Sequence, residues 1–384
     1  MKRFVYGLMT LCLLAALLPG RAEAVDLPIE SRAAILMEKK TGEILYAKNE
    51  HEPLEPASVT KIMTLLLTME AIDSGALRYD DVVTASDYAS SMGGSQIFLA
   101  AGEQMTVEDL LKGVCVASGN DASVALAEHL AGVTELFVTQ MNNRAKELGM
   151  NDTHFVNCNG LPAEGHVTSA YDIALMSREL ILHHPDIRRF TTIWMDTLRG
   201  GASEISNTNK LIRFYDGATG LKTGSTSSAG YCISATAERD GMELVAVILK
   251  ADTSDKRFAD AKTLLNYGFS TYGLFDASKG LETDDVPVKM GTAPSVRPVL
   301  CGDAALLVER GQMAGVERTI TLAESVDAPV EAGDVLGEVT VTAGDTVLAR
   351  LPLCAAESVP RLTWGQMLGR ILRMALMAEQ KNGF

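Results

Sequence analysis

The chain has 384 residues, of which 47% are hydrophobic and 22% are charged, and its formal net charge at pH 7 is −15. This composition is typical of a globular protein, and the length is enough for two or three domains. The excess of acidic residues argues against a nucleic-acid-binding protein, which needs clustered cations to neutralise phosphates. We therefore expect no nucleic acid among the partners.

Residues 1–24 have the features of a secretory signal peptide. Lys2 and Arg3 precede an apolar run over residues 4–18, and Ala22-Glu23-Ala24 supplies the small residues of a cleavage site. The alternative is a membrane anchor, but the run is short for a spanning helix. We predict removal of residues 1–24 and export of the rest, which has 31 basic and 48 acidic residues.

After the signal peptide, the predicted elements are strands, then helices, then strands again. Apolar runs at 34–37 and 44–47 flank a turn at Gly42 and predict two strands. Helices are predicted over 58–72, 108–132 with an interruption at 118–120, 134–149, 169–184 and 254–273, and strands up to 223, over 231–238 and over 243–250. Strands at both ends with helices between them predict an α+β domain over residues 25–273, with its terminal strands in one sheet.

The composition changes after this domain. Residues 276–357 contain short β-rich runs separated by Gly, Pro and Asp, which predicts a small all-β sandwich. Residues 361–384 place Trp364, Leu368 and Ile371 at helical spacing among basic residues, which is typical of an amphipathic helix at a membrane surface. The alternatives are a helix that packs on its own β domain and a helix that binds a partner.

The cysteines and histidines do not form a metal-binding pattern. The five cysteines after the signal peptide have no zinc spacing, and the six histidines form no H-E-x-x-H motif. We therefore expect no metal and no cofactor. The simplest interpretation of the cysteines is small buried side chains, and a disulfide between Cys301 and Cys354 is the alternative.

The first indication of chemistry is the stretch "EPASVTKIMTLLLTMEAI", residues 55–72. A helix that is apolar on almost all sides is usually buried, and an unpaired lysine there costs several kcal/mol. Lys61 follows Ser58 by three residues, so the two share a face, and a serine beside an amine of lowered pKa can become a nucleophile. The simpler alternative is that Lys61 reaches solvent from the first turn.

Two further motifs give this pair a context. Ser118-Gly119-Asn120 interrupts two predicted helices, and Lys222-Thr223-Gly224 leads into Ser225 on a predicted strand. A second Lys-Thr-Gly at 40–42 lies in a turn, where glycine supplies the turn geometry, and we exclude it. S-x-x-K, S-G-N and K-T-G in this order match the motif set of class A β-lactamases and penicillin-binding proteins, whose middle motif has an S-D-N form.

Acyl-transfer chemistry predicts roles for these residues. A Lys61 whose pKa is lowered by burial and by the Lys222 cation can take the proton of Ser58. The backbone N–H groups of Ser58 and Ser225 can form an oxyanion hole, and Ser118 can pass the proton to the leaving amine. The predicted catalytic residues are Ser58, Lys61, Ser118 and Asn120, and the predicted substrate-binding residues, which hold a carboxylate, are Lys222, Thr223, Gly224 and Ser225.

Around these motifs the chain resembles the D-alanyl-D-alanine carboxypeptidases among the low-molecular-mass penicillin-binding proteins. The resemblance covers almost the whole length and is carried by "EPASVTKIMT", "ASGNDASVALAEHLAG", "HFVNCNGL", "TSAYDIALMS", "NTNKL" and "GLKTGSTSSAGYC". It implies a transpeptidase-like catalytic fold and removal of the terminal D-Ala from peptidoglycan pentapeptides. It also implies covalent capture by β-lactams such as penicillin and attachment to the outer face of a bacterial membrane.

Two positions depart from the family pattern. Ser225 stands where some members have His or Tyr, and Thr208 stands where some have a carboxylate-binding arginine. A class A β-lactamase remains a rival interpretation, although Glu164 has no asparagine partner for a deacylating water. A peptidoglycan D,D-endopeptidase and a penicillin-binding sensor with little turnover are two further interpretations of the same motif set.

Overall fold

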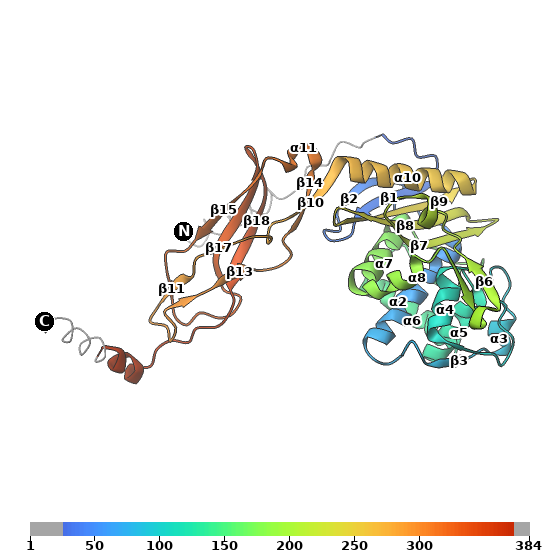
Figure 1. Cartoon of the computed structure of the whole chain (residues 1–384), viewed down its shortest axis with the longest axis horizontal. Coiled ribbons are helices and arrows are strands. Elements are labelled where there is room, and N and C mark those ends of the chain that lie inside the picture. Colours follow the sequence, from blue (N-terminus) through green and yellow to red (C-terminus); the bar gives the residue numbers. More distant parts are fainter. Residues whose placement is uncertain (1–25, 372–384) are drawn as a thin grey trace, which may run out of the picture.

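The computed structural model describes residues 26–371. A region of helices and strands is followed by a β-rich region, and the two lie end to end in an elongated molecule (Figure 1). The predicted signal peptide, residues 1–24, lies outside the described residues, as do residues 372–384.

A five-stranded antiparallel sheet is the centre of the first region, with the order β2-β1-β9-β8-β7. The first strand of the region in sequence pairs with the last, so the prediction that the terminal strands share one sheet is confirmed. β7 is an edge strand, which leaves one side of it free for other elements. The strands are β1 (Ala33–Glu38), β2 (Ile44–Lys48), β7 (Ala218–Thr226), β8 (Gly230–Arg239) and β9 (Met242–Ala251).

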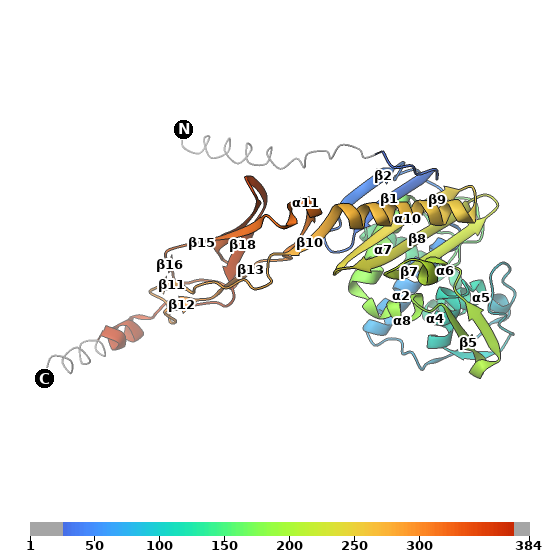
Figure 2. The ribbon, with the colours of Figure 1, turned by 45° about the horizontal axis from the view of Figure 1, so that its top comes forward.

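Both faces of this sheet are covered, which explains why β9 is apolar at nearly every position. Val245, Val247 and Leu249 belong to the core shared with the helical part, whereas Leu244 and Ile248 belong to the core under α10 (Ser254–Thr271). Alternate residues of a strand point to opposite faces, so a strand covered on both sides has to be apolar throughout. Figures 1 and 2 show α10 along one face and helices such as α2, α4 and α7 beyond the other.

The helical part lies on the face opposite α10. Three of its helices begin at a side-chain cap, and the longest of these is α7, where the hydroxyl of Ser169 accepts from the Asp172 N–H. Two short antiparallel strand pairs, β3–β4 and β5–β6, extend from it. The elements are α2 (Lys61–Asp73), β3 (Val82–Thr84), α3 (Asp87–Ser90), β4 (Gln104–Thr106), α4 (Val107–Cys115), α5 (Asn120–Ala131), α6 (Thr134–Glu147), α7 (Ala170–His183), α8 (Arg188–Thr191), β5 (Met195–Leu198) and β6 (Ser203–Ser206). The short helix α9 (Leu211–Phe214) lies on the α10 side, where Leu211 belongs to the core under α10.

The second region is all-β apart from one short helix, as the sequence predicts. A four-stranded sheet, β13-β18-β17-β15, and a three-stranded sheet, β12-β11-β16, bury separate apolar clusters. The chain enters through β10 (Tyr272–Asp276), which pairs with β14 (Ala305–Glu309), so the predicted boundary at 273–276 falls inside a strand. The others are β11 (Val286–Lys289), β12 (Ser295–Val296), β13 (Pro298–Leu300), α11 (Arg310–Met313), β15 (Val316–Leu322), β16 (Val326–Asp327), β17 (Val335–Ala343) and β18 (Thr346–Ala355).

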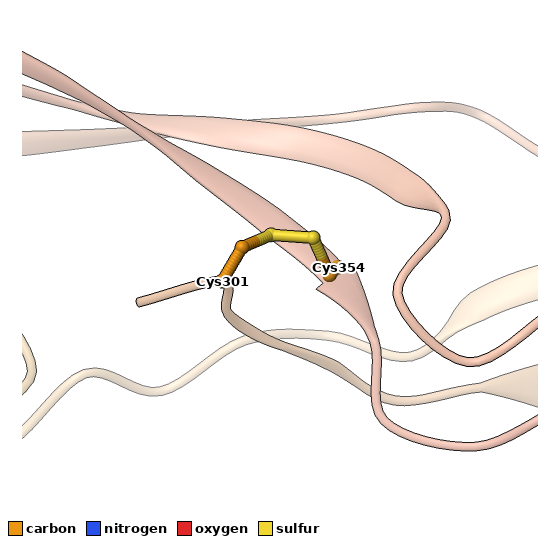
Figure 3. Close-up of a disulfide and its surroundings, with 2 residues drawn as sticks. All are labelled: Cys301 and Cys354. Carbon is orange, nitrogen blue, oxygen red and sulfur yellow. A yellow bond between two sulfur atoms is a disulfide. The ribbon is translucent and has the colours of Figure 1, made fainter. Parts of the chain in front are cut away.

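A disulfide joins two strands of this region (Figure 3). Cys301, just after β13, is bonded to Cys354 on β18, and their Cα atoms are 5.4 Å apart. The alternative interpretation, a disulfide between Cys301 and Cys354, is therefore correct, and the simpler interpretation is wrong for this pair. Cys115, Cys158 and Cys232 are buried free thiols, which agrees with the simpler interpretation of the cysteines as small buried side chains.

The predicted C-terminal helix is described only over its first turns. Residues 364–371 are helical, and the remainder lies outside the described residues. Trp364 is 87% exposed, and Leu368 and Ile371 are also exposed, so the apolar face of these turns does not pack on the β domain. None of the helices within residues 26–371 is both long and apolar enough to cross a membrane.

Candidate active site

The turn that carries Ser58 differs from the sequence prediction. The predicted helix over 58–72 begins as a 3-10 helix, η2 (Ala57–Thr60), and the α-helix starts at Lys61. Thr60 already has helical φ and ψ of −43° and −37°, so Ser58 lies inside a helical turn and is not an N-cap. Ala57 before it has φ +48°, a region that non-glycine residues rarely adopt. The backbone of the turn is therefore tightly constrained.

Lys61 is completely buried, and its amine has three partners. Nζ lies 2.9 Å from Ser58 Oγ, 2.5 Å from Asn120 Oδ1 and 2.7 Å from the carbonyl oxygen of Asn159. Burial lowers the pKa of Lys61 well below its ordinary value, and the Lys222 cation lowers it further. The alternative that Lys61 reaches solvent is wrong.

These contacts fit a neutral amine. A neutral amine has two N–H donors and one lone pair, and two of the three neighbours, Asn120 Oδ1 and the Asn159 carbonyl, can only accept. If both N–H groups point to these oxygens, the lone pair faces the hydroxyl of Ser58. The arrangement can therefore remove a proton from Ser58.

The predicted Ser118-Gly119-Asn120 motif connects α4 to α5. Ser118 has φ +62°, which turns the chain between the two helices. Its Oγ lies 2.7 Å from Lys222 Nζ. The Asn120 amide donates to the Gly93 carbonyl at 2.7 Å, which fixes its oxygen toward Lys61.

The Lys222-Thr223-Gly224 motif lies on the edge strand β7, next to the Ser58 turn. Lys222 is buried, and burial together with the Arg257 cation lowers its pKa to about 7. Gly224 is required because a Cβ atom there would lie 2.8 Å from Ser58 N. Ser225, the next residue of the strand, is exposed. The motif thus lies against the nucleophile turn, whereas the excluded Lys-Thr-Gly at 40–42 lies in the turn between β1 and β2.

Two parts of the site were missed by sequence reasoning. The first is the Asn159 carbonyl, which contacts Lys61. Gly160 beside it has φ +83°, and a Cβ atom there would lie 1.9 Å from the backbone carbonyl oxygen of Ala57. Arg257 on α10 donates to the Gly224 carbonyl at 3.2 Å and supports β7 from behind. "HFVNCNGL" contributes to the family resemblance, but a backbone contact leaves no residue-type signal. Arg257 is far from the motifs in sequence.

The comparisons with known proteins decide the family. Residues 21–253 match the family model for peptidase S11, D-alanyl-D-alanine carboxypeptidase. The chain belongs to this family. Residues 269–361 match a second model, the C-terminal domain of penicillin-binding protein 5, so the β-rich region is also typical of these proteins.

Individual relatives extend the match over most of the chain. D-alanyl-D-alanine carboxypeptidase DacF of Bacillus subtilis is 42% identical over 352 residues, which cover 90% of each protein. DacD of Escherichia coli is 34% identical over 362 residues, with 89% of each covered. The crystal structure of penicillin binding protein 5 from Haemophilus influenzae has a TM-score of 0.78 at 30% identity and covers 88% of this chain and 100% of its own.

The family fixes the reaction class. The protein is a serine-type D-Ala-D-Ala carboxypeptidase, a hydrolase of the penicillin-binding protein group with a role in peptidoglycan metabolism. The predicted fold, a transpeptidase-like domain followed by a β domain, is confirmed. Within residues 26–371, no cluster of three or more His, Cys, Asp or Glu side chains is arranged to hold a metal ion.

Proposed function

We propose that Ser58 is the nucleophile. Its attack releases the terminal D-Ala of a peptidoglycan stem peptide, and the rest of the peptide stays bound to Ser58 as an ester, the acyl-enzyme. The observation that carries this proposal is the buried Lys61 amine, 2.9 Å from Ser58 Oγ with two carbonyl oxygens as its remaining partners. Neutral Lys61 takes the hydroxyl proton as Ser58 attacks the amide carbonyl. Water then hydrolyses the ester and regenerates the enzyme.

The remaining predicted residues complete this cycle. The N–H groups of Ser58 and Ser225 stabilise the tetrahedral oxyanion, and Ser118 delivers a proton to the leaving amine. The contact of Ser118 Oγ with Lys222 Nζ supports this path, because it links the hydroxyl to an ammonium donor. Asn120 orients Lys61 through its side-chain oxygen.

The terminal carboxylate binds on β7 in this proposal. Lys222 supplies the charge, and the hydroxyls of Thr223 and Ser225 supply donors, with Gly224 between them. A bound carboxylate raises the pKa of Lys222, which restores its positive charge. Thr223 Oγ1 donates to Thr208 Oγ1 at 2.7 Å, and because a hydroxyl has one proton, Thr223 turns it from Thr208 to the carboxylate when substrate binds. Thr208 lies beside this carboxylate site without contributing a charge.

The same site is proposed to capture β-lactams covalently. Penicillin-binding protein D2 from Listeria monocytogenes, solved in an ampicillin-bound form, is 34% identical and has a TM-score of 0.59 over 64% of this chain. The exposed apolar residues of the C-terminal helix, Trp364, Leu368 and Ile371, support attachment of residues 361–384 to a membrane surface. We place the enzyme outside the cytoplasmic membrane, on its outer face.

The test uses the mature chain, residues 25–384, with a peptide that ends in D-Ala-D-Ala and with penicillin. We expect D-Ala release and a penicillin adduct on Ser58, and Ser58→Ala should lose both. Ser270→Ala, a change at an exposed serine of α10, is the matched control and should keep both. An adduct on another serine would refute the assignment, and an adduct without D-Ala release would favour a penicillin-binding sensor.

A further inference from the structure

A pocket of about 460 Å³ opens directly beside the proposed carboxylate site. Ala117, which precedes Ser118, and Thr208, which contacts Thr223, both line it. The C-terminal residue of the substrate, whose carboxylate is proposed to bind on β7, therefore lies at the mouth of this pocket. Pockets of roughly 300–1,000 Å³ bind small molecules, and the methyl side chain of D-Ala fills little of such a space.

The wall formed by residues 96–99 is held rigidly. The buried Asp121 carboxylate accepts from the backbone N–H groups of Ile97 and Leu99 at 3.0–3.1 Å. From the other side, Arg199 donates to the carbonyls of Ile97 and Phe98 at 3.1 and 3.2 Å. A wall fixed on both sides keeps its shape without a ligand.

The hydrogen bonds from Asp121 and Arg199 hold an aromatic residue, Phe98, in an unusual backbone conformation. Phe98 has φ +58° and is 80% exposed, although the residues on both sides of it are buried. Non-glycine residues in this backbone region cluster at ligand-binding sites. Phe98 lines the pocket, where it offers an apolar surface to an aliphatic side chain.

The opposite wall is the hairpin β5–β6, and its charge is negative. All four residues of β6, from Ser203 to Ser206, line the pocket together with Thr208 just beyond the strand. Glu204, Ser206 and Thr208 are exposed, whereas Ile205 between them is buried. Arg199, the cation of the pocket, forms an ion pair with Glu103 at 2.6 Å, so its charge is already compensated. Glu204 is exposed and has no ion pair with any other described residue.

We propose that this pocket receives the side chain of the leaving residue and accepts long side chains that end in an amine. Such a chain places its methylene groups against Phe98 and its ammonium group near Glu204. The reaction is unchanged: the amide is hydrolysed through Ser58, and the leaving amine takes the proton. This inference rests on the proposed function and widens its substrate class from D-Ala-D-Ala to D-Ala followed by a basic D-residue.

The test compares three diacetylated L-Lys-D-Ala-D-Xaa peptides, with D-Ala, D-Lys or D-Glu as the last residue. We expect the full mature enzyme to release D-Lys with a kcat/KM at least about fivefold above that for D-Glu, as for one partly exposed charge pair. Glu204→Gln should remove this preference, and Glu204→Lys should reverse it. The matched control Glu317→Lys, at an exposed glutamate of the β domain, should keep the wild-type order.

The outcomes separate the two proposals. If D-Ala is released but D-Lys and D-Glu are released equally slowly by the wild type and by Glu204→Lys, the pocket proposal is overturned and the proposed function stands. If the wild type releases none of the three residues, the proposed function fails and the pocket proposal fails with it.

Discussion

Two buried lysines lie in one site, and their environments give them different tasks. Lys61 is completely buried, and burial together with the nearby Lys222 cation lowers its pKa, which favours the neutral base. Lys222 contacts the Ser118 hydroxyl and lies on the strand proposed to hold the substrate carboxylate, which favours the charged form once substrate is bound. The same residue type therefore serves as base in one position and as cation in the other.

His166 is a further residue whose environment fixes its state. Its Nδ1 accepts from the Val156 N–H at 2.9 Å, so the proton is on Nε2, which donates to Thr60 Oγ1 at 2.8 Å. Thr60 in turn donates to the Ala57 carbonyl at 2.8 Å. The chain of hydrogen bonds ends at the residue before Ser58, and we infer that His166 positions the nucleophile turn.

Replacement of His166 should therefore affect both stability and acylation. His166→Gln should lower the free energy of unfolding by about 1–3 kcal/mol, as expected when a buried hydrogen bond is lost. It should also slow penicillin acylation more than it weakens penicillin binding. Urea unfolding and acylation kinetics measure these effects, and His129→Gln, at an exposed histidine, should change neither.

The sign of the pH dependence provides a second readout. Burial lowers the pKa of His166 to about 4, below its ordinary value. The unfolded chain therefore binds the proton at higher pH than the folded one, and stability should fall as the pH drops from about 6.5 towards 4. His166→Gln should reduce this loss, and an unchanged pH dependence in the variant would contradict the role assigned to His166.

At the scale of elements, the site depends on how closely β7 approaches η2. Gly224 lies where a Cβ would be 2.8–2.9 Å from Ser58 N, the Pro56 oxygen and Val59 N. These neighbours are backbone atoms, so they cannot rotate away. The contact holds the strand that binds the substrate against the turn that attacks it.

Gly224→Ala should push these two elements apart. We expect penicillin acylation to fall by roughly 100-fold, the loss associated with a misplacement of about 1 Å between reacting groups. Gly311→Ala, where an added Cβ meets nothing within 4 Å, is the control and should keep the wild-type rate. A Gly224→Ala enzyme with a normal acylation rate would show that the contact is not needed.

Elements with strong patterns were predictable from the sequence, and short polar ones were not. The apolar runs of β1 and β9 and the periodic helices α6, α7 and α10 were expected, because burial imposes a clear period on them. The strand pairs β3–β4 and β5–β6 were missed, since three- or four-residue strands with exposed residues leave no such period. The predicted site residues lie together. Asn159 was missed because it acts through its backbone carbonyl, and Arg257 was missed because its guanidinium contacts the Gly224 carbonyl from a helix outside the motifs.

At the scale of the whole molecule, the two regions have separate apolar cores. They meet at the β10–β14 pair, where Arg310 donates to the carbonyls of Phe269 and Tyr272 at 2.7 and 3.1 Å. The disulfide joins residues 53 apart in the sequence and lies entirely in the second region. Its effect on stability should therefore be confined to that region.

Removal of the disulfide tests this separation. Cys301→Ser should destabilise the β-rich region by about 2–4 kcal/mol, since the reduced chain gains conformational freedom when unfolded. In a calorimetric scan, one transition should shift to lower temperature, and D-Ala release at moderate temperature should continue. Equal destabilisation of both regions would mean that they unfold as one unit.

The central claim is that Lys61 is the neutral base for Ser58, and the pH dependence of acylation tests it most directly. The measurement is the second-order rate constant for penicillin acylation of Ser58 from about pH 5 to about pH 11. The rate should fall on the acid side as Lys61 is protonated. Because the pKa of Lys61 is lowered, we predict that the pKa read from this fall lies well below the ordinary lysine pKa of about 10.4. Lys61→Arg, which keeps the charge but cannot act as a base, should be inactive at every pH. A rate that rises with a lysine-like pKa near 10.4, or an active Lys61→Arg enzyme, would contradict this account.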